Sequence, residues 1–146
     1  MADRVPQTHA NHTRYVPGYH FVATTLVFLN LVYTVVRIFR APSLATVMAA
    51  LTAVALVLVW FYARVFALSV QDRVIRLEMQ LRLQRVLPDE LRARIGELTR
   101  GQFVALRFAC DAELPALVRK VLEEKITDRK RIKLAVRTWQ PDYLRA

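Results

Sequence analysis

Cysteine and glycine are scarce in this sequence, which contains Cys110 alone and three glycines. A single cysteine allows no intramolecular disulfide and no multi-cysteine metal site. No Walker, GxGxxG, HExxH, GxSxG or CxxC motif is present, so the common phosphate-binding and catalytic loops are excluded. No histidine follows His20, so Cys110 has no nearby base in the sequence, and a buried structural thiol is the better interpretation than a nucleophile.

Charge is almost absent between Gly18 and Ala63, where Arg37 and Arg40 are the only charged residues. Two apolar segments fill this region, at about residues 19–39 and 44–66. A helix of about 20 apolar residues spans the ~30 Å hydrocarbon core of a bilayer. Two such segments in a chain this short predict a transmembrane hairpin rather than two buried helices of a soluble protein.

Basic residues near the ends of the segments predict their orientation. Arg4 and Arg14 precede the first segment, whereas Arg64, Arg73, Arg76 and Arg82 follow the second. Because only Arg37 and Arg40 flank the short connection, we expect both termini in the cytoplasm and a location in a bacterial inner membrane. The residues expected at the membrane interfaces are basic or aromatic: Arg14, Tyr19, Arg37, Arg40, Trp60, Tyr62 and Arg64.

Small and polar residues predict how the hairpin packs. Ala45, Ala49 and Ala53 recur every four residues and would allow a close approach of the two helices. Asn30 lies near the middle of the first segment, where an amide without a partner is costly in lipid. Antiparallel pairing places Asn30 at about the depth of Thr52, so we expect a hydrogen bond between these two side chains.

The second segment has no helix breaker from Ser43 to Leu87, which predicts one long helix that leaves the bilayer. Beyond the bilayer, four apolar residues recur at heptad spacing and form what we call the interaction stripe: Val70, Val74, Leu77 and Leu81. A second apolar line runs beside it: Ile75, Met79, Leu83 and Val86. We expect the downstream helices to cover the interaction stripe, with dimerisation through it as the alternative. The spacing also predicts Asp72–Arg76 and Glu78–Arg82 ion pairs.

The remainder of the chain reads as short helices. Their predicted core consists of Ile95, Leu98, Phe103, Leu106, Leu114, Leu117, Val118, Leu122, Ile132, Val136 and Trp139. Pro88 opens one to Leu98, Thr99 and Gln102 have capping-box spacing, Asp111 caps the next, and Thr127 or Asp128 caps a last one that Pro141 closes. The predicted fold is therefore an all-α membrane protein with a transmembrane hairpin and a small cytoplasmic helical domain. Its parts are a polar tail (1–18), the hairpin (19–66), a membrane-proximal helix (67–87) and a basic helical domain (88–146).

Two further features of the sequence bear on metal binding and nucleic-acid binding. His9, His12 and His20 lie in or near the N-terminal tail without a cysteine or carboxylate cluster, so no metal site and no cofactor is predicted. The stretch from Leu98 to Val121 loosely resembles the helix-turn-helix of response regulators. It lacks the usual glycine of the turn, has Pro115 in the second helix and carries nearby acids, which disfavours nucleic-acid binding.

Several segments together resemble a family of small bacterial membrane proteins with two spans, classed only as a domain of unknown function. The residues that carry the resemblance are Asn11-His12-Thr13-Arg14, Pro17-x-Tyr19-His20, VQDRVIRLE (70–78), Leu81-Arg82, QFVALRFACDAELP (102–115) and IKLAVRTWQPDYLRA (132–146). Cys110 departs from a more usual serine, and Pro141-Asp142-Tyr143 from a common Ala-Asp-His. The resemblance implies the architecture and no mechanism.

The sequence thus predicts a membrane-anchored, non-enzymatic interaction or scaffold protein, such as an accessory subunit of an inner-membrane complex. Lys and Arg number 22 against 12 Asp and Glu, and most of this surplus follows Arg64. Such a surplus beside a bilayer favours anionic lipid headgroups. The expected partners are these lipids and a protein, either a second copy or another membrane protein. A membrane-bound regulator that binds nucleic acid is the alternative.

Overall fold

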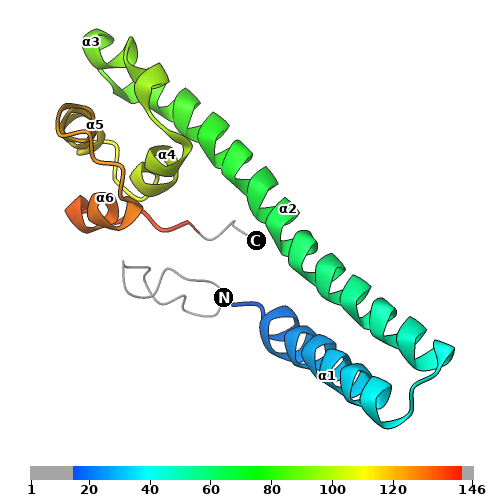
Figure 1. The fold of residues 1–146 in the computed structure, drawn as a ribbon. Coiled ribbons are helices and arrows are strands. Elements are labelled where there is room, and N and C mark those ends of the chain that lie inside the picture. The colour runs from blue at the N-terminus through cyan, green and yellow to red at the C-terminus, as the bar shows by residue number, and fades with distance from the viewer. Residues whose placement is uncertain (1–14, 143–146) are drawn as a thin grey trace. The chain divides into compact units, whose positions relative to one another are not determined.

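A computed structural model gives the fold, and it describes residues 15–142 (Figure 1). Within this range every named element is a helix, which confirms the predicted all-helical class. The described residues divide into two compact units, 15–68 and 69–142. The first unit is the hairpin, and the second holds the short helices of the C-terminal half.

The hairpin consists of a π-helical turn η1 (Gly18–Ala23), helix α1 (Thr24–Arg40) and the first part of helix α2 (Leu44–Val86). The Thr24 hydroxyl donates to the carbonyl of Tyr19 at 3.0 Å, which fits the wider turn. At the start of α2, the Ser43 amide donates to the Thr46 hydroxyl at 2.9 Å, and the Thr46 amide donates to the Ser43 hydroxyl at 3.2 Å. Ser43 therefore caps α2, and Pro42 lies outside the helix rather than in its first turn.

Gly18–Arg40 and Leu44–Val86 are both long and apolar enough to cross a membrane. Only 6% of the most apolar window of the first and 17% of that of the second are buried. A helix in the core of a soluble protein would be mostly buried, so these values disfavour that interpretation. The two apolar helices suggest a membrane protein.

The packing face of the hairpin differs from the predicted alanine stripe. Ala53 is buried, but Ala45 and Ala49 are exposed, so the prediction for those two residues is wrong. Thr46 and Ala50 take their place, and the spacing from Thr46 through Ala50 to Ala53 is that of a heptad seam. Thr46 is drawn inward because its hydroxyl also donates to the Ala41 carbonyl at 3.2 Å, which sets the rotation of α2 at the turn.

The predicted hydrogen bond between Asn30 and Thr52 does not form. Both residues are exposed, and the Thr52 hydroxyl donates to the Met48 carbonyl of its own helix at 2.9 Å. The rotation that buries Ala53 turns the adjacent Thr52 away from α1, because neighbouring residues lie about 100° apart on a helix. Asn30 therefore projects an amide with no partner among residues 15–142 from an apolar helix.

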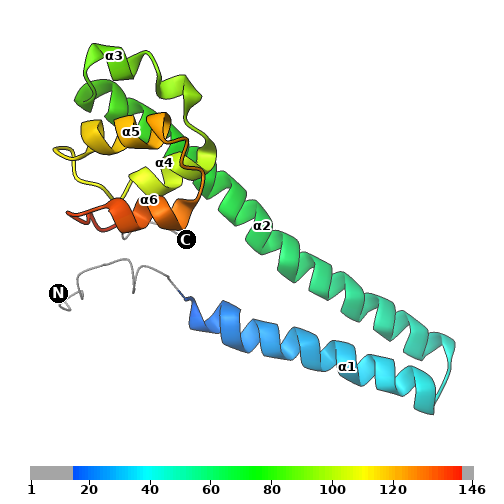
Figure 2. The ribbon, with the colours of Figure 1, turned by 60° about the vertical axis from the view of Figure 1, so that its left-hand side comes forward.

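Helix α2 continues without interruption to Val86, which confirms the predicted long helix. In the second unit it is followed by α3 (Asp89–Arg92), η2 (Ile95–Glu97), α4 (Arg100–Leu106), α5 (Leu114–Glu123) and α6 (Arg129–Ala135). Helices α4, α5 and α6 gather beside the C-terminal part of α2 (Figure 2). Arg129 of α6 comes so close to α4 that a Cβ at Gly101 would lie 2.9 Å from its Nε.

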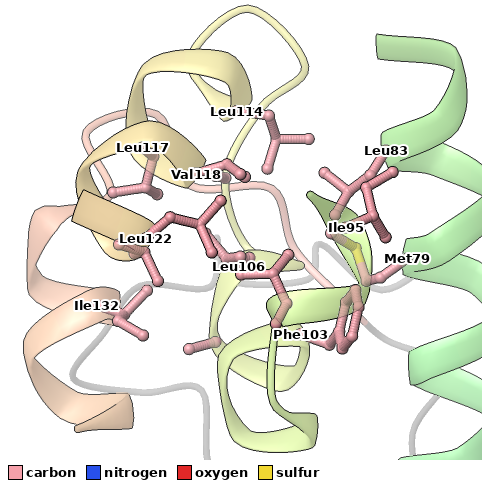
Figure 3. Packing of buried hydrophobic residues seen from close by; sticks show 14 of the residues in the cluster. Met79, Leu83, Ile95, Phe103, Leu106, Leu114, Leu117, Val118, Leu122 and Ile132 are labelled. Atoms are coloured by element: carbon pink, nitrogen blue, oxygen red, sulfur yellow. The ribbon is translucent and has the colours of Figure 1, made fainter. Parts of the chain in front are cut away.

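The second unit has one apolar core, to which all of its helices contribute (Figure 3). Met79 of α2 lies beside Phe103 of α4, and side chains of α5 and Ile132 of α6 close the other side. Nine of the core residues predicted from the sequence are buried: Ile95, Leu98, Phe103, Leu106, Leu114, Leu117, Val118, Leu122 and Ile132. The two others, Val136 and Trp139, are partly buried.

The capping predictions were partly right. Thr99 and Gln102 form the reciprocal capping box of α4, and Asp128 caps α6 by accepting from the Lys130 amide at 2.9 Å. Asp111 does not cap α5, whose N-cap is Glu113. The helix expected from Pro88 to Leu98 breaks into α3 and η2, and α6 ends at Ala135 rather than near Pro141.

Candidate interaction surface

The membrane-proximal part of α2 has two apolar lines, and the core covers only one of them. Ile75, Met79 and Leu83 are buried, as is Leu87 just after the helix. The interaction stripe is exposed, at 61% for Val70, 49% for Val74, 59% for Leu77 and 55% for Leu81. The prediction that the downstream helices cover this stripe is therefore wrong: they cover the second line.

Helix geometry explains why the core can cover only one of the two apolar lines of α2. Residues two apart on an α-helix, such as Leu77 and Met79, point about 200° apart. A core on one side of α2 can reach Met79 only by leaving Leu77 on the opposite side. The two lines contain similar residues, so the sequence did not indicate which line the short helices would pack against. What remains is an apolar helix face that no described residue covers.

The charges beside the interaction stripe also differ from expectation. Asp72 pairs with Arg100 of α4 at 3.6 Å rather than with Arg76. Arg82 pairs with Asp111 at 2.6 Å rather than with Glu78. The expected pairs along the helix are therefore wrong, because each inward-turned member finds a partner across the core. Arg73, Arg76 and Glu78 are exposed and make no ion pair with any residue from 15 to 142.

Arg82 is the centre of a polar cluster that we call the Arg82 cluster, and its guanidinium joins α2 to two other segments, the turn between α4 and α5 and the segment after α6. Its Nε donates to Asp111 Oδ1 at 2.6 Å, and its Nη1 to the Arg107 carbonyl at 3.1 Å. Its Nη2 donates to the Ala109 carbonyl at 2.7 Å and to Gln140 Oε1 at 2.5 Å. The Arg82 side chain is only 16% exposed. A planar fork of donors suits such a site, where one cation satisfies several acceptors.

The segment after α6 is tied to the start of α5 by Glu113. Its carboxylate accepts from the Arg137 amide at 3.1 Å and from the Thr138 amide at 3.4 Å. The adjacent Trp139 pairs with Ala109 in an isolated antiparallel bridge. These contacts hold residues 137–139 outside a helix, which is consistent with the end of α6 at Ala135.

An aromatic pair lies beside the same segment. Phe108 and Trp139 stack with ring centroids 4.4 Å apart. The Arg107 guanidinium lies 4.5 Å from the Phe108 ring centre, and the Lys133 ammonium lies 5.2 Å from it. Arg107 also pairs with Asp142 at 3.1 Å, and its side chain is 8% exposed. Cations packed against a ring at this depth stabilise the fold locally.

Local spacing in the sequence does not indicate that Arg82, Arg107, Glu113 and Trp139 lie together. A signal was present, because three of the segments that carry the family resemblance contribute to these contacts: Leu81-Arg82, residues 102–115 and, within residues 132–146, the described part up to residue 142. Over its full length, residues 1–146, the sequence matches the model of DUF6526, a family of unknown function. The chain belongs to DUF6526. No curated protein matches it. No solved structure matches it either.

At the open end of the DUF6526 hairpin, residues predicted for one membrane interface lie together. The Tyr19 hydroxyl donates to the Trp60 carbonyl at 2.6 Å, and the two rings stack at 5.9 Å. Tyr62 stacks on Phe66 at 5.6 Å, and Arg64 is partly exposed. These contacts place Tyr19 and Trp60 at the same end of the hairpin.

At the connection between α1 and α2, Arg37 donates to the Tyr33 hydroxyl at 3.2 Å, and its guanidinium lies 5.9 Å from that ring. Arg40 is exposed at the last position of α1. Arg14, His9 and His12 lie outside the described residues. The position of the connection relative to a membrane stays a prediction.

In this DUF6526 chain, His20 and Cys110 make local contacts with the backbone or with a neighbouring side chain. The Nδ1 atom of His20 lies 3.0 Å from the Val16 amide and 3.1 Å from its carbonyl. Cys110 is partly buried, and its amide donates to Glu113 at 3.4 Å. In the described range, no three His, Cys, Asp or Glu residues lie close enough to hold a metal ion.

The exposed basic residues of α5 face acids. Arg119 pairs with Glu90 of α3, and Lys120 lies 4.0 Å from Glu124. A surface that binds nucleic acid through phosphates presents cations to solvent, whereas these two are engaged by carboxylates. Elsewhere on the surface, Arg94 donates twice to Glu97 at 2.9 Å. This hydrogen bonding lowers the pKa of the Glu97 carboxyl and raises the pKa of Arg94, and it clamps the turn of η2.

Proposed function

We propose that this protein is a membrane-anchored, non-enzymatic interaction protein that binds a protein partner through the interaction stripe of α2. The observation that carries the proposal is the exposure of all four stripe residues while the opposite face of the same helix is buried. An apolar stripe on a water-exposed helix is costly unless a partner covers it, and such patches mark interaction sites. The Arg82 cluster fixes the short helices on the opposite face, so they do not compete for the stripe.

The anchor in this proposal is the hairpin of α1 and the first part of α2. Its exposed apolar surface suits lipid, and the aromatic pair of Tyr19 and Trp60 suits a membrane–water interface. Arg64 lies a few residues beyond Trp60 and would contact anionic headgroups. Both termini then face the cytoplasm of a bacterial cell. The interaction stripe lies next to the inner membrane, on its cytoplasmic side.

The amide of Asn30 gives independent support for a protein partner. It projects from the apolar helix α1 and has no hydrogen-bond partner among the described residues. In hydrocarbon such a group favours contact with a second helix that can hydrogen-bond to it, with a gain of roughly 0.6–2 kcal/mol. The transmembrane region, like the stripe, thus favours an assembly over an isolated chain.

The test is site-specific photo-crosslinking in native membranes. A photoreactive phenylalanine analogue placed at Leu77 should give a discrete adduct that mass spectrometry can identify. The matched control carries the analogue at Glu123, which is exposed on α5 away from the stripe. Adduct from Leu77 and little from Glu123 supports the proposal. The absence of adduct from Leu77, or equal labelling from both positions, would overturn it.

A further inference from the structure

The interaction stripe has the residue pattern of a helix that pairs with a parallel copy of itself. Its steps of four, three and four residues alternate as in a heptad seam. Val74 then takes the a position and Leu77 the d position. In this central pair a β-branched residue stands at a and leucine at d, the combination that favours two parallel strands. The outer residues are reversed, with Val70 at d and Leu81 at a.

Charges on the two sides of the seam complement each other in that arrangement. Arg73 precedes Val74 and takes the g position, whereas Glu78 follows Leu77 and takes the e position. In a parallel pair, g of one helix lies beside the e that follows in the partner helix. Arg73 of each copy therefore faces Glu78 of the other, which gives two symmetric ion pairs across the seam.

Both charges are available for this role because of the Arg82 cluster. Arg82 lies four residues after Glu78 and would pair with it on an isolated helix. Its guanidinium is instead held by Asp111 and Gln140. Glu78 and Arg73 remain exposed and have no ion-pair partner in the described part of the chain. The contact that builds the soluble unit thus leaves the two charges that flank the seam unpaired.

The anchor makes parallel pairing the natural geometry. Two copies inserted with the same orientation send α2 out of the bilayer in the same direction. Confinement to one membrane also raises their effective concentration. The stripe is shorter than the three or four heptads that a free coiled coil needs, but a pair already held side by side needs less.

We propose that a second copy of this chain covers the interaction stripe, with the two α2 helices parallel, Val74 and Leu77 at the centre, and Arg73 of each copy paired with Glu78 of the other. This inference rests on the proposed function, since the membrane anchor sets the parallel orientation. The interface is isologous, as expected for a two-fold dimer.

Cysteine crosslinking of the full chain in membranes tests the geometry. In a Cys110→Ser background, single cysteines replace Val70, Leu77 and Leu81 in turn, with Arg76→Cys as the exposed control on the same helix. A mild oxidant should give disulfide-linked dimers from all three stripe positions and few from position 76. In an antiparallel pair, equivalent residues meet at one position at most, so dimers from a single position would contradict parallel pairing. Equal dimer yield at position 76 would indicate random collision and would also overturn the proposal.

Charge reversal tests the pairing of Arg73 with Glu78. With Leu77→Cys as the reporter, Arg73→Glu or Glu78→Arg alone should lower the dimer yield about fivefold or more, since two exposed pairs are replaced by like charges. The double variant Arg73→Glu/Glu78→Arg should restore it. Failure of the double variant to recover would overturn the assigned register, because each pair would be re-formed with its charges exchanged.

The outcomes also separate this inference from the function on which it rests. Photo-adducts at Leu77 that contain only a different protein, together with no disulfide dimer, would sustain the proposed function and overturn self-pairing. The absence of both products would overturn the two together. The fluorescence of Trp139, which is packed in the soluble unit, verifies in a Trp60→Phe background that each variant is folded before its yield is compared.

Discussion

The guanidinium of Arg82 donates to the carboxylate of Asp111 across 29 positions of sequence, at 2.6 Å. The same guanidinium also donates hydrogen bonds to two backbone carbonyls and to the Gln140 side chain. It therefore substitutes for secondary-structure hydrogen bonds where the chain turns between α4 and α5. The two partners are unequal in burial, at 16% exposed for the Arg82 side chain and 65% for that of Asp111.

This inequality predicts unequal mutational costs. Arg82→Gln should lower the free energy of unfolding of the soluble unit by about 2–4 kcal/mol, because two backbone carbonyls in partly buried hydrogen bonds lose their donor. Asp111→Asn should cost less than about 1 kcal/mol, since an exposed ion pair contributes little. The measurement is denaturant unfolding of the full chain in detergent, followed by Trp139 fluorescence in a Trp60→Phe background. Equal costs for the two variants would show that the carboxylate, rather than the carbonyls, is the main partner.

The two apolar lines of α2 should respond oppositely to charge. Met79→Asp puts a carboxylate into the core and should destabilise the soluble unit by about 3 kcal/mol or more. Leu77→Asp should change the free energy of unfolding by less than about 0.5 kcal/mol in detergent that separates the copies, because this side chain is exposed. Comparable destabilisation by both variants would mean that the soluble unit also covers the stripe.

Lys125 offers a stabilising substitution. It follows α5 in the left-handed region with φ of 49°, and the Ile126 amide donates back to the Val121 carbonyl at 3.1 Å. This is the Schellman arrangement, in which glycine is favoured at the left-handed position. Lys125→Gly should therefore raise the free energy of unfolding by about 0.5–1 kcal/mol. Lys125→Ala removes the same charge but keeps the Cβ, so it should give no comparable gain in the same unfolding assay.

The orientation of the hairpin can be tested with reporters. A reporter active only in the cytoplasm should function when fused after Ala146, and one active only in the periplasm should be silent. The reason is the excess of arginine outside the connection between α1 and α2. Replacing Arg37 and Arg40 by serine should strengthen this orientation. The opposite reporter pattern would place the interaction stripe on the other side of the membrane.

The sequence by itself determined the elements that depend on local chemistry. The apolar runs predicted α1 and α2, the missing breakers predicted the continuity of α2 to Val86, and Thr99, Gln102 and Asp128 predicted their caps. These features depend on residues within a few positions of each other. Most of the apolar core of the soluble unit also followed from helical periodicity, because side chains three or four residues apart share a face.

Tertiary structure alone decided which face of each helix is used. Leu77 and Met79 are both apolar, and Ala49 and Ala50 are both alanine, so periodicity allowed two possible buried faces in each case. These faces differ by about 100° for Ala49 and Ala50 and by about 200° for Leu77 and Met79. The rotation of α2 at the Ser43–Thr46 turn buries Ala50 rather than Ala49, and packing against Phe103 buries Met79 rather than Leu77. Arg82 follows the same rule: Glu78 is its local partner by spacing, but its guanidinium instead donates to the carbonyls of Arg107 and Ala109 in a distant segment. A long-range contact of that kind cannot be read from spacing, and it is what leaves the interaction stripe and its charges exposed.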